Sequence, residues 1–126
     1  PLVVSDDPHA AADAVRWYAA LYVGGMGSRE KNFYNQLAVR MGYEDAAKQI
    51  QDKYLARDYE GAGAAVPYEF IDSTALLGPK ERIAEKMQTL AASGVTTLTV
   101  SPFGASQQDK IASLRTAVEA LELAGV

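Results

Sequence analysis

The sequence predicts an α/β protein that is rich in helix and carries a small parallel sheet. Short apolar or β-branched runs, which are typical of strands, occur at residues 2–4, 75–77 and 95–100. Apolar residues at spacings of three and four separate these runs and indicate helices. From Ala75 onward strand and helix alternate, and this βαβα order is typical of a parallel sheet with both faces covered.

Length and composition narrow the class further. The chain has 126 residues, of which 48% are hydrophobic, enough for one domain with an ordinary core. A net charge of -4 without a basic run argues against nucleic acid or an anionic membrane as a partner. No cysteine is present, which excludes disulfides, thiolate zinc sites and a cysteine nucleophile. No apolar run approaches the ~18 residues of a membrane span, and we expect a soluble, cytoplasmic protein.

The chain opens on an apolar segment, residues 1–4, that runs directly into Ser-Asp-Asp-Pro. This order is that of the end of a strand followed by a helix, and it suggests a fragment of a longer protein. Asp7 is a good N-cap and Pro8 suits the first helical position, where its missing N–H is not needed. These residues predict a helix over residues 8–23.

A glycine-rich run, residues 24–28, is expected to stop that helix, with Ser28 capping the next one. One interpretation is a corner between two helices. The other is an anion site, in which bare N–H groups with Ser28, Arg29 and Lys31 hold a phosphate. No strand precedes the run and no Gly-Lys-Ser/Thr follows it, which excludes a Walker motif and a dinucleotide fingerprint.

Three further segments complete the middle of the chain. Helices are predicted over residues 29–41, ended by Gly42, and over residues 44–57. Residues 58–66, rich in alanine and glycine, could form a weak helix or a loop. Pro67 is expected to open a short helical turn through Ile71.

The last third holds two further helices around a strand. Pro79 starts a helix that Gly94 ends, and Ser106 with Asp109 forms a variant of the capping box for the final helix, closed by Gly125. The periodicity of the final helix predicts that its large apolar residues face the core: Ile111, Leu114, Val118 and Leu121.

The exit from the strand at residues 95–100 is the candidate functional edge. Ser101, Pro102, Phe103 and Gly104 form a turn-prone segment that presents a hydroxyl and an aromatic ring. Parallel α/β sheets place their ligand sites at the carboxyl ends of strands. Two or three short strands cannot form such a sheet alone. A complete (β/α)₈ barrel takes ~250 residues, so the chain would be about half of one, with exposed edges.

Four stretches resemble a known family: residues 21–34 (LYVGGMGSREKNFY), 66–72 (VPYEFID), 76–83 (LLGPKERI) and 93–100 (SGVTTLTV). They are similar to the C-terminal part of the luciferase-like oxidoreductases. Within that superfamily the closest resemblance is to the branch that depends on the deazaflavin coenzyme F420, which includes methylenetetrahydromethanopterin reductase. The match covers nearly the whole chain.

The resemblance implies the C-terminal part of a TIM barrel, about strands six to eight, with a helical insertion before the seventh. The chain would then be a single fragment with three parts: residues 1–23 as the end of strand six and its helix, 24–74 as the helical insertion, and 75–126 as a βαβα unit. The partner for its exposed edges would be the N-terminal half of the same barrel.

The resemblance also implies a site for coenzyme F420 and hydride transfer between the deazaflavin and a small organic substrate. The residues that would contact the coenzyme are Tyr22, Val23, Gly24, Gly25, Ser101, Pro102 and Phe103. The family has Ser-Pro-Ile-Gly where this chain has Phe103, which leaves the role of that ring open. The proton-handling residues of the family lie in its N-terminal half, so no catalytic residue is assigned here, and no metal is expected.

Two alternatives stay open from the sequence. One keeps the fold and uses FMN with oxygen, as a luciferase-like monooxygenase. The other is a helical interaction module without catalysis. For the leading interpretation we expect the intact protein to be the enzyme and the chain alone to be inactive, and we expect self-association into a homo-oligomer because unpaired strand edges seek partners.

Overall fold

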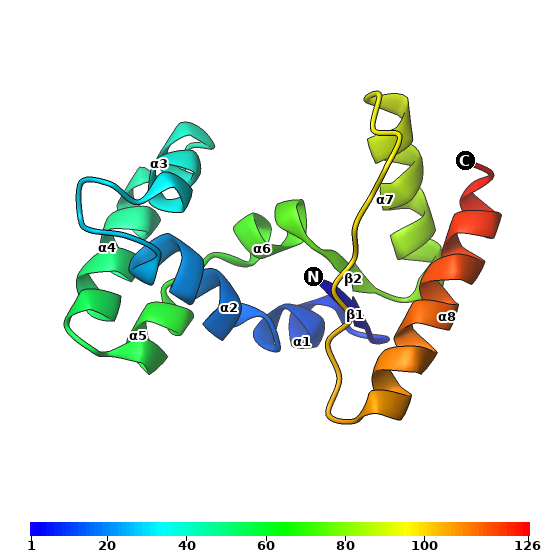
Figure 1. The fold of residues 1–126 in the computed structure, drawn as a ribbon, viewed down its shortest axis with the longest axis horizontal. Helices are drawn as coiled ribbons and strands as arrows, with labels where there is room; N and C mark the ends of the chain where they lie inside the picture. The colour runs from blue at the N-terminus through cyan, green and yellow to red at the C-terminus, as the bar shows by residue number, and fades with distance from the viewer. The chain divides into compact units, whose positions relative to one another are not determined.

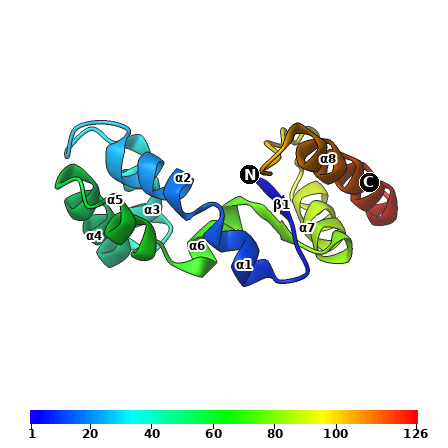
Figure 2. The ribbon, with the colours of Figure 1, turned by 90° about the horizontal axis from the view of Figure 1, so that it is seen from below.

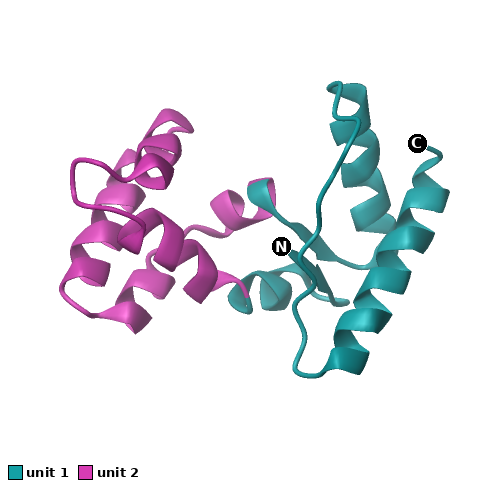
Figure 3. Ribbon diagram, viewed as in Figure 1, with its two compact units in different colours: residues 1–14, 74–126 teal, residues 15–73 magenta.

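A computed structural model describes all 126 residues and shows a helix-rich chain (Figure 1). Its elements in order are β1 (Leu2–Val4), α1 (Pro8–Asp13), α2 (Arg16–Ala20), a π-helical turn η1 (Leu21–Gly25), α3 (Phe33–Arg40), α4 (Glu44–Leu55), α5 (Tyr59–Ala64), α6 (Tyr68–Thr74), β2 (Leu76–Gly78), α7 (Lys80–Ala92) and α8 (Gln107–Ala124). They form two compact units: Pro1–Ala14 with Thr74–Val126, and Val15–Ser73 (Figure 3).

The first unit is built on a small parallel sheet, as predicted. β1 pairs with β2 in a register that sets Leu2 opposite Leu76 and Val4 opposite Gly78. A third segment touches the other edge of β1, where Leu2 forms a parallel bridge with Pro102. There the Leu2 N–H donates to the Ser101 carbonyl (2.8 Å) and the Phe103 N–H donates to the Leu2 carbonyl (2.9 Å). β1 is therefore the central strand.

Helices cover both faces of this sheet. α1 contacts β1 and β2, while α7 contacts β2 and α8 contacts β1; α7 and α8 lie side by side (Figures 1 and 2). Leu2 and Leu76 pack with Ile83 and Met87 of α7. Because successive side chains of a strand point to opposite faces, Val3 and Leu77 face the side of α1. The core of the unit is thus divided by the sheet.

The predicted strand at residues 95–100 is wrong. These residues form no ladder, and Thr96, Thr97 and Leu98 are exposed. Only Pro102, just after this segment, bridges to β1. The order of segments also differs from that of a (β/α)₈ barrel, in which consecutive strands are neighbours. Here the last segment lies beside β1 and not beside β2.

The final helix begins and ends as predicted, but it presents a different face to the core. Ser106 and Asp109 form a complete capping box, and Gly125 ends α8 in the left-handed conformation. The residues of α8 that are buried are small: Ser113, Ala117, Ala120 and Ala124. The large apolar residues expected inside are exposed, with Ile111 at 41%. Leu114, Val118 and Leu121 line an apolar groove of about 400 Å³ between α7, α8 and residues 95–100.

The second unit is entirely helical. The single helix predicted over residues 8–23 is wrong, because the chain breaks after α1 and resumes as α2 and η1. No glycine or proline marks this break, so the sequence carries no local signal for it. The glycine-rich run does not stop the helix at Gly24 either. η1 continues through Gly25, and the helical conformation ends at Met26.

The remaining helices of the second unit differ from the predictions mainly at their starts. α3 begins at Phe33 and is capped by Asn32, so the predicted cap at Ser28 is wrong. Gly42 follows α3 with φ +94°, as a C-terminal glycine should. Residues 58–66, left open by the sequence, contain the helix α5, which Asp58 caps. None of the helices combines the length and the apolar character that crossing a membrane requires.

Candidate functional site

The candidate coenzyme segment, residues 22–25, forms most of the π-helical turn η1, which continues α2 without interruption. Single π turns inside helices occur frequently at functional sites because they widen the backbone locally. Val23 and Gly24 are buried, whereas Tyr22 and Gly25 are partly exposed. Of the four candidates in this segment, only Tyr22 and Gly25 are therefore accessible to a ligand.

The two glycines of η1 allow close packing on α4. A Cβ atom at Gly24 would lie 2.5 Å from Cβ of Tyr54, and a Cβ at Gly25 would lie 2.4 Å from a ring carbon of the same residue. Real Cβ atoms do not approach so closely, so any larger residue would force the helices apart. The contact with Tyr54, which was not inferred from the sequence, explains both glycines by packing within the second unit.

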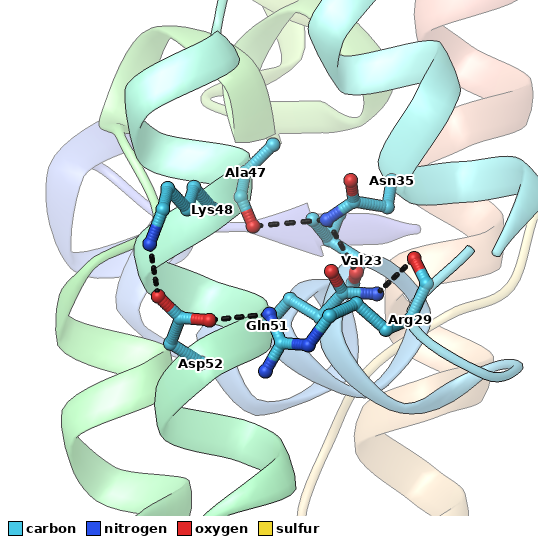
Figure 4. Close-up of polar contacts among 7 residues, drawn as sticks. All are labelled: Val23, Arg29, Asn35, Ala47, Lys48, Gln51 and Asp52. Carbon is cyan, nitrogen blue, oxygen red and sulfur yellow. Dashed lines mark hydrogen bonds and ion pairs between the residues drawn. The ribbon is translucent and has the colours of Figure 1, made fainter.

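Two asparagines hold the backbone of η1 from the other side. Asn32 donates to the carbonyls of Tyr22 and Val23, and Asn35 donates to the carbonyls of Val23 and Ala47. Figure 4 shows the amide of Asn35 between these last two carbonyls. Neither asparagine was assigned a role from the sequence. The available signal was the preference for asparagine at a helix start directly after a glycine-rich loop.

Tyr22 belongs to a row of three tyrosines. Its ring lies 4.6 Å from the ring of Tyr18 and 4.8 Å, edge to face, from the ring of Tyr34 (centroid distances). The hydrogen bond between the side chains of Tyr18 and Tyr22, and to a lesser degree burial, raises the pKa of Tyr18 above its ordinary value of 10.0. Tyr18 therefore stays neutral at physiological pH, and the row of rings offers aromatic edges and hydroxyl groups to a ligand.

The phosphate candidates Ser28, Arg29 and Lys31 lie in the turn between η1 and α3. The Arg29 guanidinium donates to the carboxylate of Asp52, which also accepts from Lys48 at 2.6 Å (Figure 4). Gln51 is buried, and its side-chain amide donates to the Arg29 carbonyl at 3.2 Å. The Ser28 carbonyl accepts from the Lys31 N–H within the same turn. Arg29 thus connects the turn to α4 through Asp52. The other candidate cation, Lys31, forms no ion pair.

The Asp52 ion pairs predict an acid dependence of stability. Hydrogen bonds from Lys48 and Arg29 lower the pKa of Asp52 below its ordinary 3.8. A lowered pKa in the folded state stabilises the fold above pH 3.8, and the stabilisation disappears as the pH falls through the lowered value. We expect wild type to be more stable than Asp52→Asn near neutral pH and the two to converge below pH 3.8 in urea unfolding. A difference that stays constant with pH would contradict this.

The second group of candidates, Ser101, Pro102 and Phe103, lies in the first unit, at the bridge with Leu2. Ser101 is exposed, and Pro102 and Phe103 are partly buried. Backbone bonds to Leu2 on both sides of Pro102 hold the backbone of this exit in place, and Ser101 offers an accessible hydroxyl. The chain nowhere gathers three His, Asp or Glu side chains that could hold a metal ion.

Comparison with known proteins identifies the family. The family described as luciferase-like monooxygenase matches residues 1–97. A protein of Mycobacterium tuberculosis named "Putative coenzyme F420-dependent oxidoreductase" is 30% identical over 113 residues, which are 90% of this chain. The chain spans about a third (33%) of the length of that relative. No solved structure is significantly similar to the chain. The resemblance inferred from the four sequence stretches is confirmed, and the chain belongs to the luciferase-like monooxygenase family.

Proposed function

We propose that this chain is the C-terminal portion of an oxidoreductase that uses coenzyme F420. The observation that carries the proposal is the 30% identity, over nearly the whole chain, with a relative named for F420 dependence. When bound, F420 would supply a hydride acceptor and donor at C5 of its deazaflavin ring, and the substrate would be a small organic molecule. The protein contributes binding, orientation and exclusion of water.

The accessible residues fit a coenzyme of this kind. Tyr22 offers an aromatic edge and a hydroxyl, Gly25 offers backbone without a side chain, and Ser101 offers a hydroxyl at a strand exit. Lys31, which follows Gly25 closely in the sequence, offers a positive charge for an anionic group. Val23 and Gly24 are buried and would support the segment from inside. No catalytic role is assigned to these residues, and the reacting protons would be handled elsewhere in the whole protein.

Within this proposal the chain is part of a (β/α)₈ barrel. A barrel would place residues 95–100 beside β2, whereas here Pro102, just after this segment, lies beside β1. The unpaired backbone of residues 95–100 supports a partner for this segment, and we propose that the partner is the N-terminal half of the same barrel. The whole protein would then contain the complete sheet, of which this chain forms only a part.

A titration with both coenzymes tests the proposed function. We expect the full-length protein to bind F420 saturably, measured by the change in coenzyme fluorescence, and not to bind FMN. The 126-residue chain alone should bind neither, because a site built from several strand ends loses most of its contacts when the other strands are missing. Preference for FMN would instead support a flavin monooxygenase, the chemistry after which the family is named.

A further inference from the structure

The end of η1 leaves backbone carbonyls that the helix itself cannot satisfy. The last carbonyls of any helix lack an N–H partner four residues ahead, and when buried they need another donor. η1 ends at Gly25, so the carbonyls of Tyr22 and Val23 belong to this terminal turn. Both accept from the Asn32 side-chain amide at 3.1 Å, and the Val23 carbonyl also accepts from Asn35 at 3.1 Å.

Asn32 uses both halves of its amide. While its nitrogen donates to the two carbonyls, its oxygen accepts from the Asn35 N–H at 2.9 Å and caps α3. The side chain is 1% exposed. A buried amide is tolerated only when its donors and acceptor are paired, which is the case here. One residue therefore fixes the end of η1 relative to the start of α3.

The remaining sides of η1 are fixed as well. Gly24 and Gly25 press on Tyr54 of α4, and the ring of Tyr22 lies between those of Tyr18 and Tyr34. Among the contacts of η1, only the hydrogen bonds from Asn32 and Asn35 act on its backbone carbonyls. Without it, the peptide groups of residues 22–24 could rotate, and the exposed parts of η1, Tyr22 and Gly25, would change direction with them.

We propose that Asn32, supported by Asn35, is a positioning residue that sets the orientation of the ligand-contacting surface of η1. This inference rests on the proposed function, because it assigns to Asn32 the alignment of the coenzyme contacts at Tyr22 and Gly25. Asn32 itself touches no ligand. It acts through the carbonyls of Tyr22 and Val23.

Asn32→Asp in the full-length protein tests the inference with little change in shape. The carboxylate keeps the oxygen that caps α3, but it replaces the donor with an acceptor that faces two carbonyls. Gln36→Glu is the matched control, because it makes the same chemical change on α3 at an exposed side chain that donates only to the Glu30 carbonyl. Asn32→Ser is the second variant, since serine preserves the cap and is too short to reach both carbonyls.

We expect both Asn32 variants to raise the Kd for F420 about tenfold, which corresponds to ~1.4 kcal/mol, at a temperature where every variant is fully folded. Gln36→Glu should bind as wild type does. Amide hydrogen exchange at residues 22–26 should accelerate in the Asn32 variants alone. A residue with a merely structural role would lower the unfolding midpoint and leave the Kd unchanged.

The outcomes separate the inference from the function on which it rests. An unchanged Kd in a folded Asn32 variant, beside normal binding by wild type, overturns the positioning role and leaves the proposed function intact. Failure of wild type itself to bind F420 overturns the proposed function and the inference with it. A tenfold loss in both Asn32 variants with a normal Gln36→Glu supports both.

Discussion

Ile83→Ala is expected to lower the free energy of unfolding of the first unit by about 2–5 kcal/mol, because it empties space in a packed core. Ile83 is 1% exposed and packs with Leu2 and Leu76 under α7. Far-UV circular dichroism during urea unfolding measures the change.

Ile111→Ala is the matched control for this substitution, since it removes the same atoms from α8, where the side chain is 41% exposed. Surface changes of this kind stay within about 0.5 kcal/mol. Equal losses at Ile83 and Ile111 would contradict the orientation of α8 described above and would mean that the large apolar face of α8 is covered.

Gly24→Ala is the second substitution with a large expected effect. The added Cβ would lie 2.5 Å from Cβ of Tyr54 and 3.2 Å from the Ile50 carbonyl oxygen, and neither atom can rotate away. Overpacking of this kind typically costs about 1–3 kcal/mol and occasionally more. The fluorescence of Trp17, the single tryptophan, reports on the second unit during unfolding.

Gly63→Ala provides the comparison for Gly24→Ala. Gly63 also lies in a helix of the second unit, α5, but a Cβ there would meet its nearest neighbour, Arg16, at 3.8 Å, an ordinary contact. Alanine in an unobstructed helical position is favoured over glycine by roughly 0.5–1 kcal/mol, so this variant should be more stable than wild type. A neutral Gly24→Ala would show that η1 and α4 are not closely packed.

Local signals in the sequence were sufficient for features that depend on neighbouring residues. The capping box of Ser106 with Asp109, the helix end at Gly125 and the strand at residues 2–4 are confirmed, and the strand predicted at residues 75–77 is found at Leu76–Gly78. The two caps depend on hydrogen bonds or backbone preferences within a few residues, and the two strands have apolar composition that is visible locally, although their pairing is not local. The family was likewise recognisable from short stretches, and it is confirmed.

Features that depend on distant partners could not be predicted in this way. The β-branched residues 95–100 suit a strand, but a strand exists only where another backbone pairs with it. In α8 the periodicity of Ile111 and its large neighbours indicated a core face, whereas the helix packs on α7 through Ala117 and Ala120. Small residues permit the close approach of two helices. Hydrophobic periodicity alone does not show whether the alanine face or the face with the large apolar residues packs against the core.

At the candidate site the sequence indicated the segment but not what holds it. Tyr22 and Gly25 are accessible, while Asn32, Asn35 and Tyr54, which contact η1, lie 9 to 30 positions after the residues that they touch. Single-sequence patterns report the residue types of such partners and not their proximity. Ser28 was predicted as the cap in place of Asn32, and only the folded structure shows that Asn32 caps α3 and also donates to the carbonyls of η1.

The sheet of the first unit has a consequence for the order of folding. β1 and β2 pair directly, yet the whole of Val15–Ser73 lies between them in the sequence. Closing a flexible loop becomes harder with its length, by about 0.6 kcal/mol for each doubling. The second unit contains only helices joined by short turns, and local contacts of this kind form fast. Once it has folded, its ends are tethered and the loop that β1 and β2 must close is effectively shorter. A substitution that destabilises the second unit should therefore delay the pairing of β1 with β2, although both strands belong to the first unit.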